Sequence, residues 1–195
     1  MLKRFLGIYF TGIVIKLMDD YLDLKEDKLN EEFNFFYLLH KGILPYTLII
    51  FFIALSFNFN EALTLFSSSY IIGMGYEWKT KYSSGLKGWQ ESIIIMIITI
   101  YFTSFHKFFL SFIFILSAQL IDDLIDFNNE LTNFKNTVNI FGLTPTIILI
   151  LIFILFLYKI DYILIIYYFS ALFSLYLTFL LFKLYYLKRL NHYDY

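Results

Sequence analysis

Seven apolar runs, separated by short polar segments, make up most of this 195-residue chain. They cover residues 2–18, 42–59, 62–76, 93–105, 108–121, 143–158 and 162–186. Backbone N–H and C=O groups find no water inside a bilayer, so apolar runs of this kind fold there as helices. With 59% hydrophobic residues and a mean hydropathy of +0.69, the chain lies far outside the composition of soluble domains. The sequence predicts an all-α, polytopic transmembrane bundle of about seven spans.

The runs predict one domain over residues 1–195, with no linker. Residues 93–121 could form a single helix, but a rise of about 1.5 Å per residue makes it too long for one crossing. We therefore expect a tight turn at Ser104 to Lys107. The chain has no cysteine, which excludes a disulfide framework and a thiolate metal site.

The charges predict an integral protein of the cell membrane. With seven spans, one face receives eleven of the fifteen basic residues and fourteen of the sixteen acidic ones. The positive-inside rule makes this face cytoplasmic, although Lys3 and Arg4 oppose it. The N-terminal run ends in acidic residues instead of a small-residue cleavage site, so no cleavable signal peptide is expected.

Two similar acidic motifs end apolar runs on that face, Asp19-Asp20-Tyr21-Leu22-Asp23 and Asp122-Asp123-Leu124-Ile125-Asp126. A charged side chain at mid-bilayer costs about 2.5–3.5 kcal/mol, and placement at its edge still costs part of this. Each motif ends one apolar helix and is followed by a polar loop and a helical pair, so the sequence contains a weak internal repeat. The repetition favours a shared function over solvated surface acids, and the loops lack the pattern of a calcium-binding hand.

Residues four apart share a helix face. Asp19, Asp23 and Asp27 therefore form one predicted column, and Asp122 with Asp126 forms another. Mg²⁺ prefers hard oxygen ligands, usually carboxylates together with phosphate oxygens. Facing columns would hold Mg²⁺, or Mn²⁺, and through it a diphosphate. Asp123 is the weakest candidate, since it points about 100° away from Asp122 on the helix.

The motifs resemble those of the UbiA superfamily of intramembrane prenyltransferases. Residues 19–27 are similar to the family pattern Asn-Asp-x-x-Asp-x-x-x-Asp, with Asp19 in place of Asn, and residues 122–126 to Asp-x-x-x-Asp. Residues 135–142, Lys-Asn-Thr-Val-Asn-Ile-Phe-Gly, are similar to a stretch that follows the second motif. Residues 76–81 are similar to the family's Tyr- and Lys-rich loop. Family members usually have nine helices, so a smaller bundle with a smaller cavity is expected here.

The resemblance implies Mg²⁺-dependent ionisation of a prenyl diphosphate and transfer of the prenyl group to a lipophilic acceptor. It implies metal binding by Asp19, Asp20, Asp23, Asp27, Asp122 and Asp126, catalysis by Asp23 and Asp126, and diphosphate contact by Lys79, Lys81 and Lys135. Two alternatives stay open, namely a membrane terpene cyclase and a non-catalytic isoprenoid-binding protein. The expected partners are the substrates and membrane lipid, and no nucleic-acid partner is expected.

Overall fold

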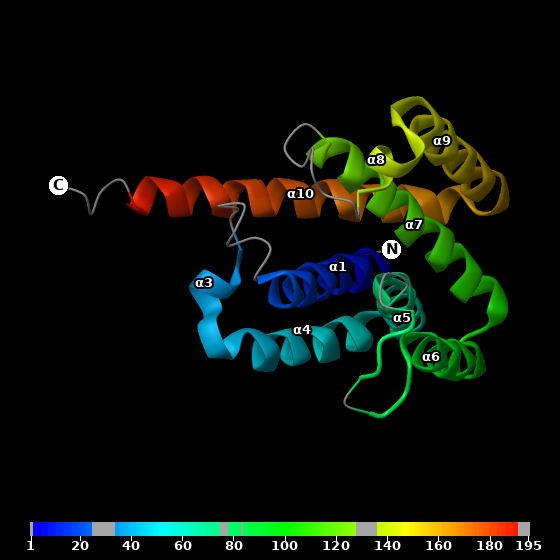
Figure 1. Cartoon of the computed structure of the whole chain (residues 1–195), viewed down its shortest axis with the longest axis horizontal. Helices are drawn as coiled ribbons and strands as arrows, with labels where there is room; N and C mark the ends of the chain where they lie inside the picture. Colours follow the sequence, from blue (N-terminus) through cyan, green and yellow to red (C-terminus); the bar gives the residue numbers. More distant parts are fainter. Residues whose placement is uncertain (1, 25–33, 75–77, 83, 128–135, 191–195) are drawn as a thin grey trace. The chain divides into compact units, whose positions relative to one another are not determined.

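The computed structural model describes residues 2–24, 34–74, 78–82, 84–127 and 136–190. Within these ranges the chain is helical, apart from turns and one isolated bridge between Lys81 and Lys87. The helices are α1 (Leu2–Leu22), α3 (Phe36–Leu39), η1 (His40–Gly42), α4 (Ile43–Phe57), α5 (Phe59–Met74), α6 (Gly88–Phe102), α7 (Phe105–Asp126), α8 (Thr137–Phe141), α9 (Leu143–Ile160) and α10 (Tyr162–Leu190) (Figure 1). The predicted all-α class is confirmed.

Within the described residues, each predicted apolar run falls mainly on one long helix of its own, but the predicted turn is shifted. The break between α6 and α7 falls at Thr103 and Ser104. The Ser104 hydroxyl accepts a hydrogen bond from the Lys107 amide at 3.4 Å, which makes Ser104 the N-cap of α7. The expected turn from Ser104 to Lys107 is therefore wrong at its C-terminal end, because this cap starts the helix at Phe105.

Within the described residues, four segments are long and apolar enough to cross a membrane: Phe36–Phe57, Phe105–Ile125, Leu143–Ile160 and Tyr162–Tyr186. In two of them, Phe36–Phe57 and Leu143–Ile160, only 17% of the apolar window is buried inside the protein. The remaining leucine, isoleucine and phenylalanine side chains face outward, where lipid tails would cover them. These segments suggest a membrane protein.

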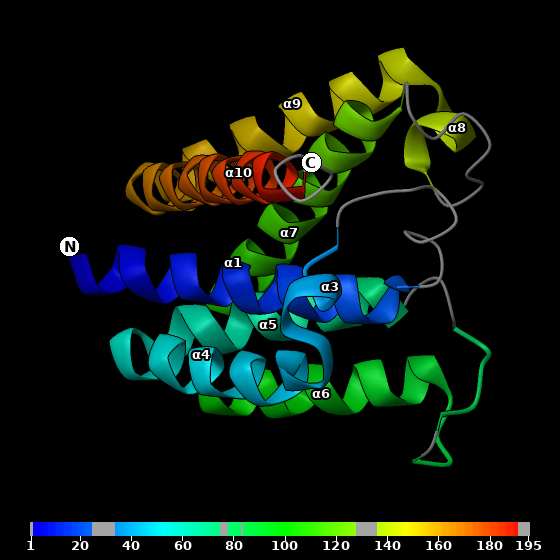
Figure 2. The same ribbon diagram turned by 90° about the vertical axis from the view of Figure 1, so that its left-hand side faces the viewer.

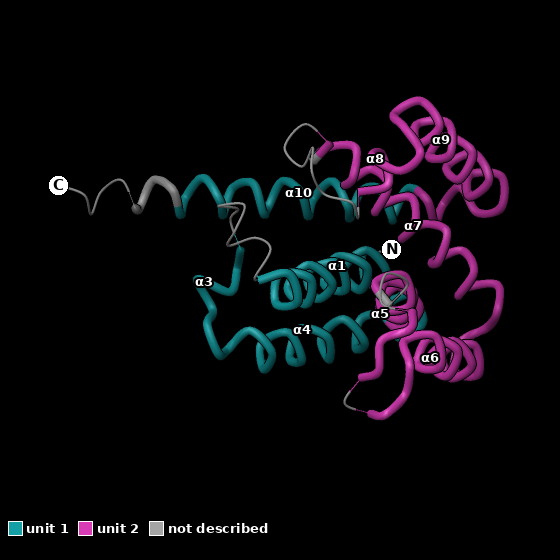
Figure 3. The backbone as a smooth tube through the Cα atoms, in the orientation of Figure 1, with its two compact units in different colours: residues 1–62, 166–195 teal, residues 63–165 magenta. Residues whose placement is uncertain are grey.

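The chain divides into two compact units, residues 1–62 with 166–195, and residues 63–165 (Figure 3). In the first unit α1 lies along α4 (Figure 2). Gly7 is needed there, because a Cβ at this position would lie 2.8 Å from the Cβ of Asn58. Leu17, Phe35 and Ile43 form a buried cluster close to the acidic end of α1.

Short hydroxyl side chains join the helices of the second unit. Thr64 of α5 and Ser111 of α7 share a hydrogen bond of 2.7 Å, and Thr99 of α6 donates one of the same length to Ser67 of α5. Small polar residues of this kind let helices in membranes approach closely and hydrogen-bond across the contact. The α7 helix also packs on α9 through an edge-to-face contact between Phe109 and Phe156, with ring centroids 6.1 Å apart.

The two units contain a structural repeat that includes the two acidic motifs and the helices after them. Each copy runs from a long helix through a short helix to a second long helix, α1, α3 and α4 in one and α7, α8 and α9 in the other. Both prolines of the chain occupy the third position of the second long helix, three residues after a glycine. These pairs are Gly42 with Pro45 and Gly142 with Pro145. Proline is tolerated there because the first turn of a helix needs no internal N–H donor.

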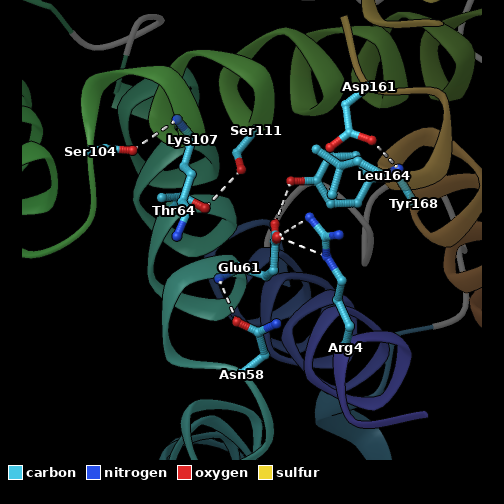
Figure 4. A network of polar contacts seen from close by, with 10 residues as sticks. All are labelled: Arg4, Asn58, Glu61, Thr64, Ser104, Lys107, Ser111, Asp161, Leu164 and Tyr168. Atoms are coloured by element: carbon cyan, nitrogen blue, oxygen red, sulfur yellow. Dashed lines mark hydrogen bonds and ion pairs between the residues drawn. The ribbon is translucent and has the colours of Figure 1, made fainter. Parts of the chain in front are cut away.

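The repeat continues beyond the second long helix. A single residue, Asn58 or Asp161, joins it to the next helix. In each copy the side chain of this residue accepts a hydrogen bond from the amide three positions later (Figure 4), Glu61 at 3.2 Å and Leu164 at 2.9 Å. The same side-chain cap therefore starts α5 and α10.

Candidate functional site

The first acidic motif lies where α1 ends. The amide of Asp23 still donates to the Asp19 carbonyl at 2.9 Å, so helical geometry continues to Asp23 although α1 ends at Leu22. The side chain of Asp19 is 56% exposed, that of Asp20 only 1%. Asp23 is half-buried. Asp27, the fourth predicted ligand, lies outside the described residues.

Asp20 is bound on both carboxylate oxygens by groups of the protein. Lys16 lies 3.0 Å from Oδ1, and the amide of Phe35 donates to Oδ2 at 2.7 Å. The side-chain amide of Asn34 donates to the main-chain carbonyl of Asp20 at 2.5 Å, and its oxygen accepts from the amide of Phe36 at 2.7 Å. These bonds tie the chain that returns after the acidic motif to the last turn of α1.

The second acidic motif lies in the last turns of α7. Asp122 is exposed and Asp123 is half-buried. Asp126 is the last residue of α7, four positions after Asp122, which places the two backbone positions on one helix face. The side chain of Asp126 lies outside the described residues.

Three hydrogen bonds at Asp123 repeat those that join Asp20 to Asn34 and the residues after it, and the Thr137 hydroxyl adds a fourth. Oδ2 of Asp123 accepts from the amide of Thr137 at 2.9 Å and from the Thr137 hydroxyl. The side-chain amide of Asn136 donates to the Asp123 carbonyl at 2.9 Å, and its oxygen accepts from the amide of Val138 at 2.9 Å. We call each set an Asp–Asn lock, formed by Asp20 with Asn34 and by Asp123 with Asn136.

The two locks differ in the residue one turn before the aspartate. This residue is Lys16 before Asp20 and Gln119 before Asp123. Lys16 also lies 3.7 Å from Oδ2 of Asp19. The first motif therefore carries a cation beside its carboxylates, whereas the corresponding position of the second motif is neutral.

Two lysines face each other on the paired segment between α5 and α6, residues 80–82 and 84–88, which we call the ribbon. Lys81 and Lys87 stand opposite each other in the isolated antiparallel bridge. Hydrogen bonds flank this pair on both sides. The Tyr82 amide donates to the Leu86 carbonyl at 3.0 Å, and the Gly88 amide donates to the Thr80 carbonyl at 3.2 Å. Lys81 and Lys87 are therefore a non-hydrogen-bonded pair. Side chains of such a pair lie on one face at close range.

Lys79 lies in the turn before this ribbon, so strand alternation does not place it on the face of Lys81. Lys79, Lys81 and Lys87 are all exposed. Like charges placed directly opposite destabilise a strand pair, so an anion on this face would relieve their repulsion. Lys135, the third predicted diphosphate contact, lies outside the described residues.

Glu91 in the first turn of α6 holds the ribbon. Its carboxylate accepts from the Ser84 hydroxyl on the ribbon and from the Tyr70 hydroxyl of α5, the latter at 2.6 Å. These hydrogen bonds, that from Ser84 first, lower the pKa of Glu91 below its usual range. The ribbon is thus tied to α5 through one carboxylate.

Among the side chains that the structure describes, no group of three or more histidine, cysteine or acidic residues is arranged to hold a metal ion. Each described motif nevertheless supplies hard carboxylate oxygens of the type that Mg²⁺ prefers. Asp27 and the Asp126 side chain, two of the six predicted ligands, lie outside that set.

Sequence reasoning missed Asn34 and Asn136. Asn136 is the N-cap of α8, whereas Asn34 lies two residues before α3, where its side-chain oxygen accepts from the Phe36 amide. Asparagine often accepts from the amide two residues later at helix starts and in turns, so a bond of this kind was predictable at both places. The glycine and proline that follow in each copy would have aligned the two asparagines.

The fold defines an all-helical protein with helices suited to a membrane. No protein-family model, no curated protein and no solved structure matches this chain.

Proposed function

We propose that this protein is a Mg²⁺-dependent intramembrane prenyltransferase of the UbiA type, with about seven spans and its acidic motifs at the cytoplasmic face of the cell membrane. The observation that carries the proposal is the repeated acidic helix end. Each copy places one exposed aspartate, Asp19 or Asp122, beside one aspartate held by an Asp–Asn lock. Exposed carboxylates on ordered helix ends suit the binding of a divalent cation and, through it, of a phosphate group.

The donor set fits Mg²⁺, and the residues that would hold it are Asp19, Asp23, Asp122 and Asp126, with Asp27. Bound Mg²⁺ would neutralise the charge that develops on the departing diphosphate. Lys79, Lys81 and Lys135 would contact the diphosphate oxygens. The opposed pair of Lys81 and Lys87 supports the assignment of Lys81, because two neighbouring ammonium groups attract a polyanion.

In the proposed reaction, the bond between the allylic carbon and the diphosphate oxygen breaks, and the electron pair leaves with the diphosphate. The allylic cation then forms a bond to a nucleophilic atom of the acceptor, which loses a proton. Apolar surroundings protect the cation from water, and aromatic faces stabilise it.

Purified protein in lipid micelles tests the proposal directly. Prenyl diphosphates of several lengths are incubated with Mg²⁺ and a lipophilic acceptor, and released diphosphate is measured with and without a chelator. We expect metal-dependent release and, by mass spectrometry, a prenylated acceptor. If diphosphate is released but no acceptor is prenylated, and a cyclic hydrocarbon or terpene alcohol forms at a rate independent of the acceptor, the protein is a terpene cyclase. Binding without release identifies an isoprenoid-binding protein.

The metal ligands are tested by Asp23→Asn and Asp126→Asn, which remove one charge each. Loss of one electrostatic contact in a dry site lowers turnover by about a hundredfold or more. Asp161→Asn is the matched control, since asparagine retains the cap that Asp161 provides to Leu164. Near-normal turnover in Asp23→Asn or Asp126→Asn would show that the ligands are assigned wrongly.

A further inference from the structure

The two Asp–Asn locks form the same bonds through loops of different length. Asn34 reaches the carbonyl of a residue 14 positions earlier, and Asn136 one that is 13 positions earlier. In both, the residue after the asparagine donates its amide to the same aspartate, and the asparagine oxygen caps the amide after that. Loop length therefore does not set this geometry. The aspartate and the asparagine set it.

We propose that Asp20 with Asn34, and Asp123 with Asn136, are positioning residues for the carboxylates beside them, and that neither locked aspartate is a metal ligand. This inference rests on the proposed metal-dependent function. It revises the assignment of Asp20 as a ligand and gives Asp123, which was the weakest ligand candidate, a definite role.

The first reason is that the locked carboxylates are already occupied. Both Asp20 oxygens have donors within 3.0 Å, and the residue is 2% exposed. Oδ2 of Asp123 accepts two hydrogen bonds from Thr137. A cation at Asp20 would have to displace these donors, and one at Oδ2 of Asp123 would have to displace those of Thr137. Asp19 and Asp122, the preceding residues, are exposed and reach outward from the same helical turn.

The second reason is what the asparagine does to that turn. The last four carbonyls of a helix lack internal donors, and the carbonyls of Asp20 and Asp123 belong to this group. Each receives the side-chain amide of its asparagine. This bond orders the turn that carries Asp19 or Asp122, which prevents fraying at the point where a ligand must be held.

The third reason is charge. The C-terminal end of a helix carries a partial negative charge and favours a cation. Here each helix instead ends in several aspartates, and the side chain that binds its last carbonyls is a neutral asparagine. The asparagine therefore orders the helix end without adding a positive charge there. In the first motif Lys16 already offsets part of the negative charge, whereas the second motif has no basic residue at the corresponding position.

The test measures metal binding directly on the full-length protein in micelles. Mn²⁺ is titrated in the presence of inorganic diphosphate, and the free ion is followed by electron paramagnetic resonance. Loss of an outer-shell partner weakens metal binding by about 10–100-fold. We expect Asn34→Ala and Asn136→Ala each to raise the half-saturating Mn²⁺ concentration at least about tenfold. Asn139→Ala is the matched control, because Asn139 is exposed on the same short helix as the residues that follow Asn136.

A second pair of variants separates a positioning role from a ligand role and does not depend on the folding of the alanine variants. In Asp123→Asn the side-chain oxygen still accepts from the Thr137 amide, so Mn²⁺ binding should stay within about threefold of the unaltered protein, since this lock needs an acceptor and not a charge. Asp123→Ala removes the acceptor and should weaken binding as Asn136→Ala does. Asp122→Asn should lose binding.

Three results would overturn the inference. Equal loss of Mn²⁺ binding in Asp123→Asn and Asp122→Asn would make Asp123 a ligand. Unchanged binding in both Asn34→Ala and Asn136→Ala would make the locks irrelevant to the metal. In either case the proposed function survives, because the unaltered protein binds Mn²⁺. If the unaltered protein binds no Mn²⁺ with diphosphate present, the proposed function fails, and this inference fails with it.

Discussion

Glu61 is a buried carboxylate that is bound within the first unit by Arg4 and Tyr168. Its side chain is 6% exposed. Arg4 donates to Oε1 from Nε at 3.0 Å and from Nη2 at 2.7 Å, and the Tyr168 hydroxyl donates to Oε2 at 2.8 Å (Figure 4). The Arg4 guanidinium also stacks 5.7 Å from the ring centroid of Tyr167. These bonds join α1, α5 and α10 at one point.

We predict that Tyr168→Phe lowers the free energy of unfolding by about 1.5–3 kcal/mol, the usual contribution of a hydrogen bond to a charged group. Tyr168 is fully buried, so water does not replace the lost donor. The measurement is denaturant unfolding in mixed micelles. Tyr167→Phe is the control and should unfold like the unaltered protein, since the phenylalanine ring retains the contact with Arg4. Equal stability of the two variants would show that the Tyr168 hydroxyl contributes nothing.

Residue-scale roles were only partly predictable. The two acidic motifs are evident in the sequence, but which aspartate of each pair is exposed and which is locked is not. That distinction depends on Asn34 and Asn136, which reach the motifs only after a loop. Spacing along the chain does not show where a loop returns.

At the scale of elements, the ribbon between α5 and α6 depends on the charge of Glu91. Hydrogen bonds from Ser84 and Tyr70 lower the pKa of Glu91 in the folded protein. A carboxylate whose pKa is lowered by folding stabilises the folded state above its unfolded pKa of about 4.3, and that contribution is lost as the pH falls through the folded pKa. Glu91 precedes the apolar run that begins at Ile93.

We therefore predict that acidification releases the ribbon from α5 with a midpoint below about pH 4.3. Trp78 and Trp89 are the two tryptophans of the chain and flank the ribbon, so intrinsic fluorescence reports on it specifically. The fluorescence should change between neutral and acid pH in the unaltered protein. Glu91→Gln removes the titrating group and should show no such transition. A transition of the same midpoint in Glu91→Gln would assign it to another group.

Elements were the most predictable level. Each apolar run became a helix because a backbone without water must bond internally. The start of α7 was misplaced because Ser104 caps the amide of Lys107, a local bond that hydropathy does not register. The Lys81–Lys87 bridge was not expected either, because a ribbon this short has no alternation of hydrophobic and polar residues that would predict strands.

At the scale of the whole molecule, the proposed topology places both acidic motifs on the cytoplasmic side. The chain has no cysteine, so single cysteines can be introduced without background. We predict that Lys28→Cys and Asn129→Cys, one in each polar loop, react with a membrane-impermeant maleimide only when the cytoplasmic face is accessible. Labelling of the two cysteines from opposite sides would exclude joint action of the motifs on one diphosphate, and with it the proposed mechanism.

The sequence by itself determined the helical class, the suitability of several helices for a membrane, and the two acidic helix ends, because these depend on local hydrophobicity and on spacing within a helix. The tertiary structure decided the rest. It showed the repeat that aligns Pro45 with Pro145, and the hydrogen bonds that hold Asn34 and Phe35 against Asp20. It also placed Lys81 and Lys87 opposite each other on the ribbon. Each of these depends on where a chain turns back, and that is set by hydrogen bonds between residues distant in sequence.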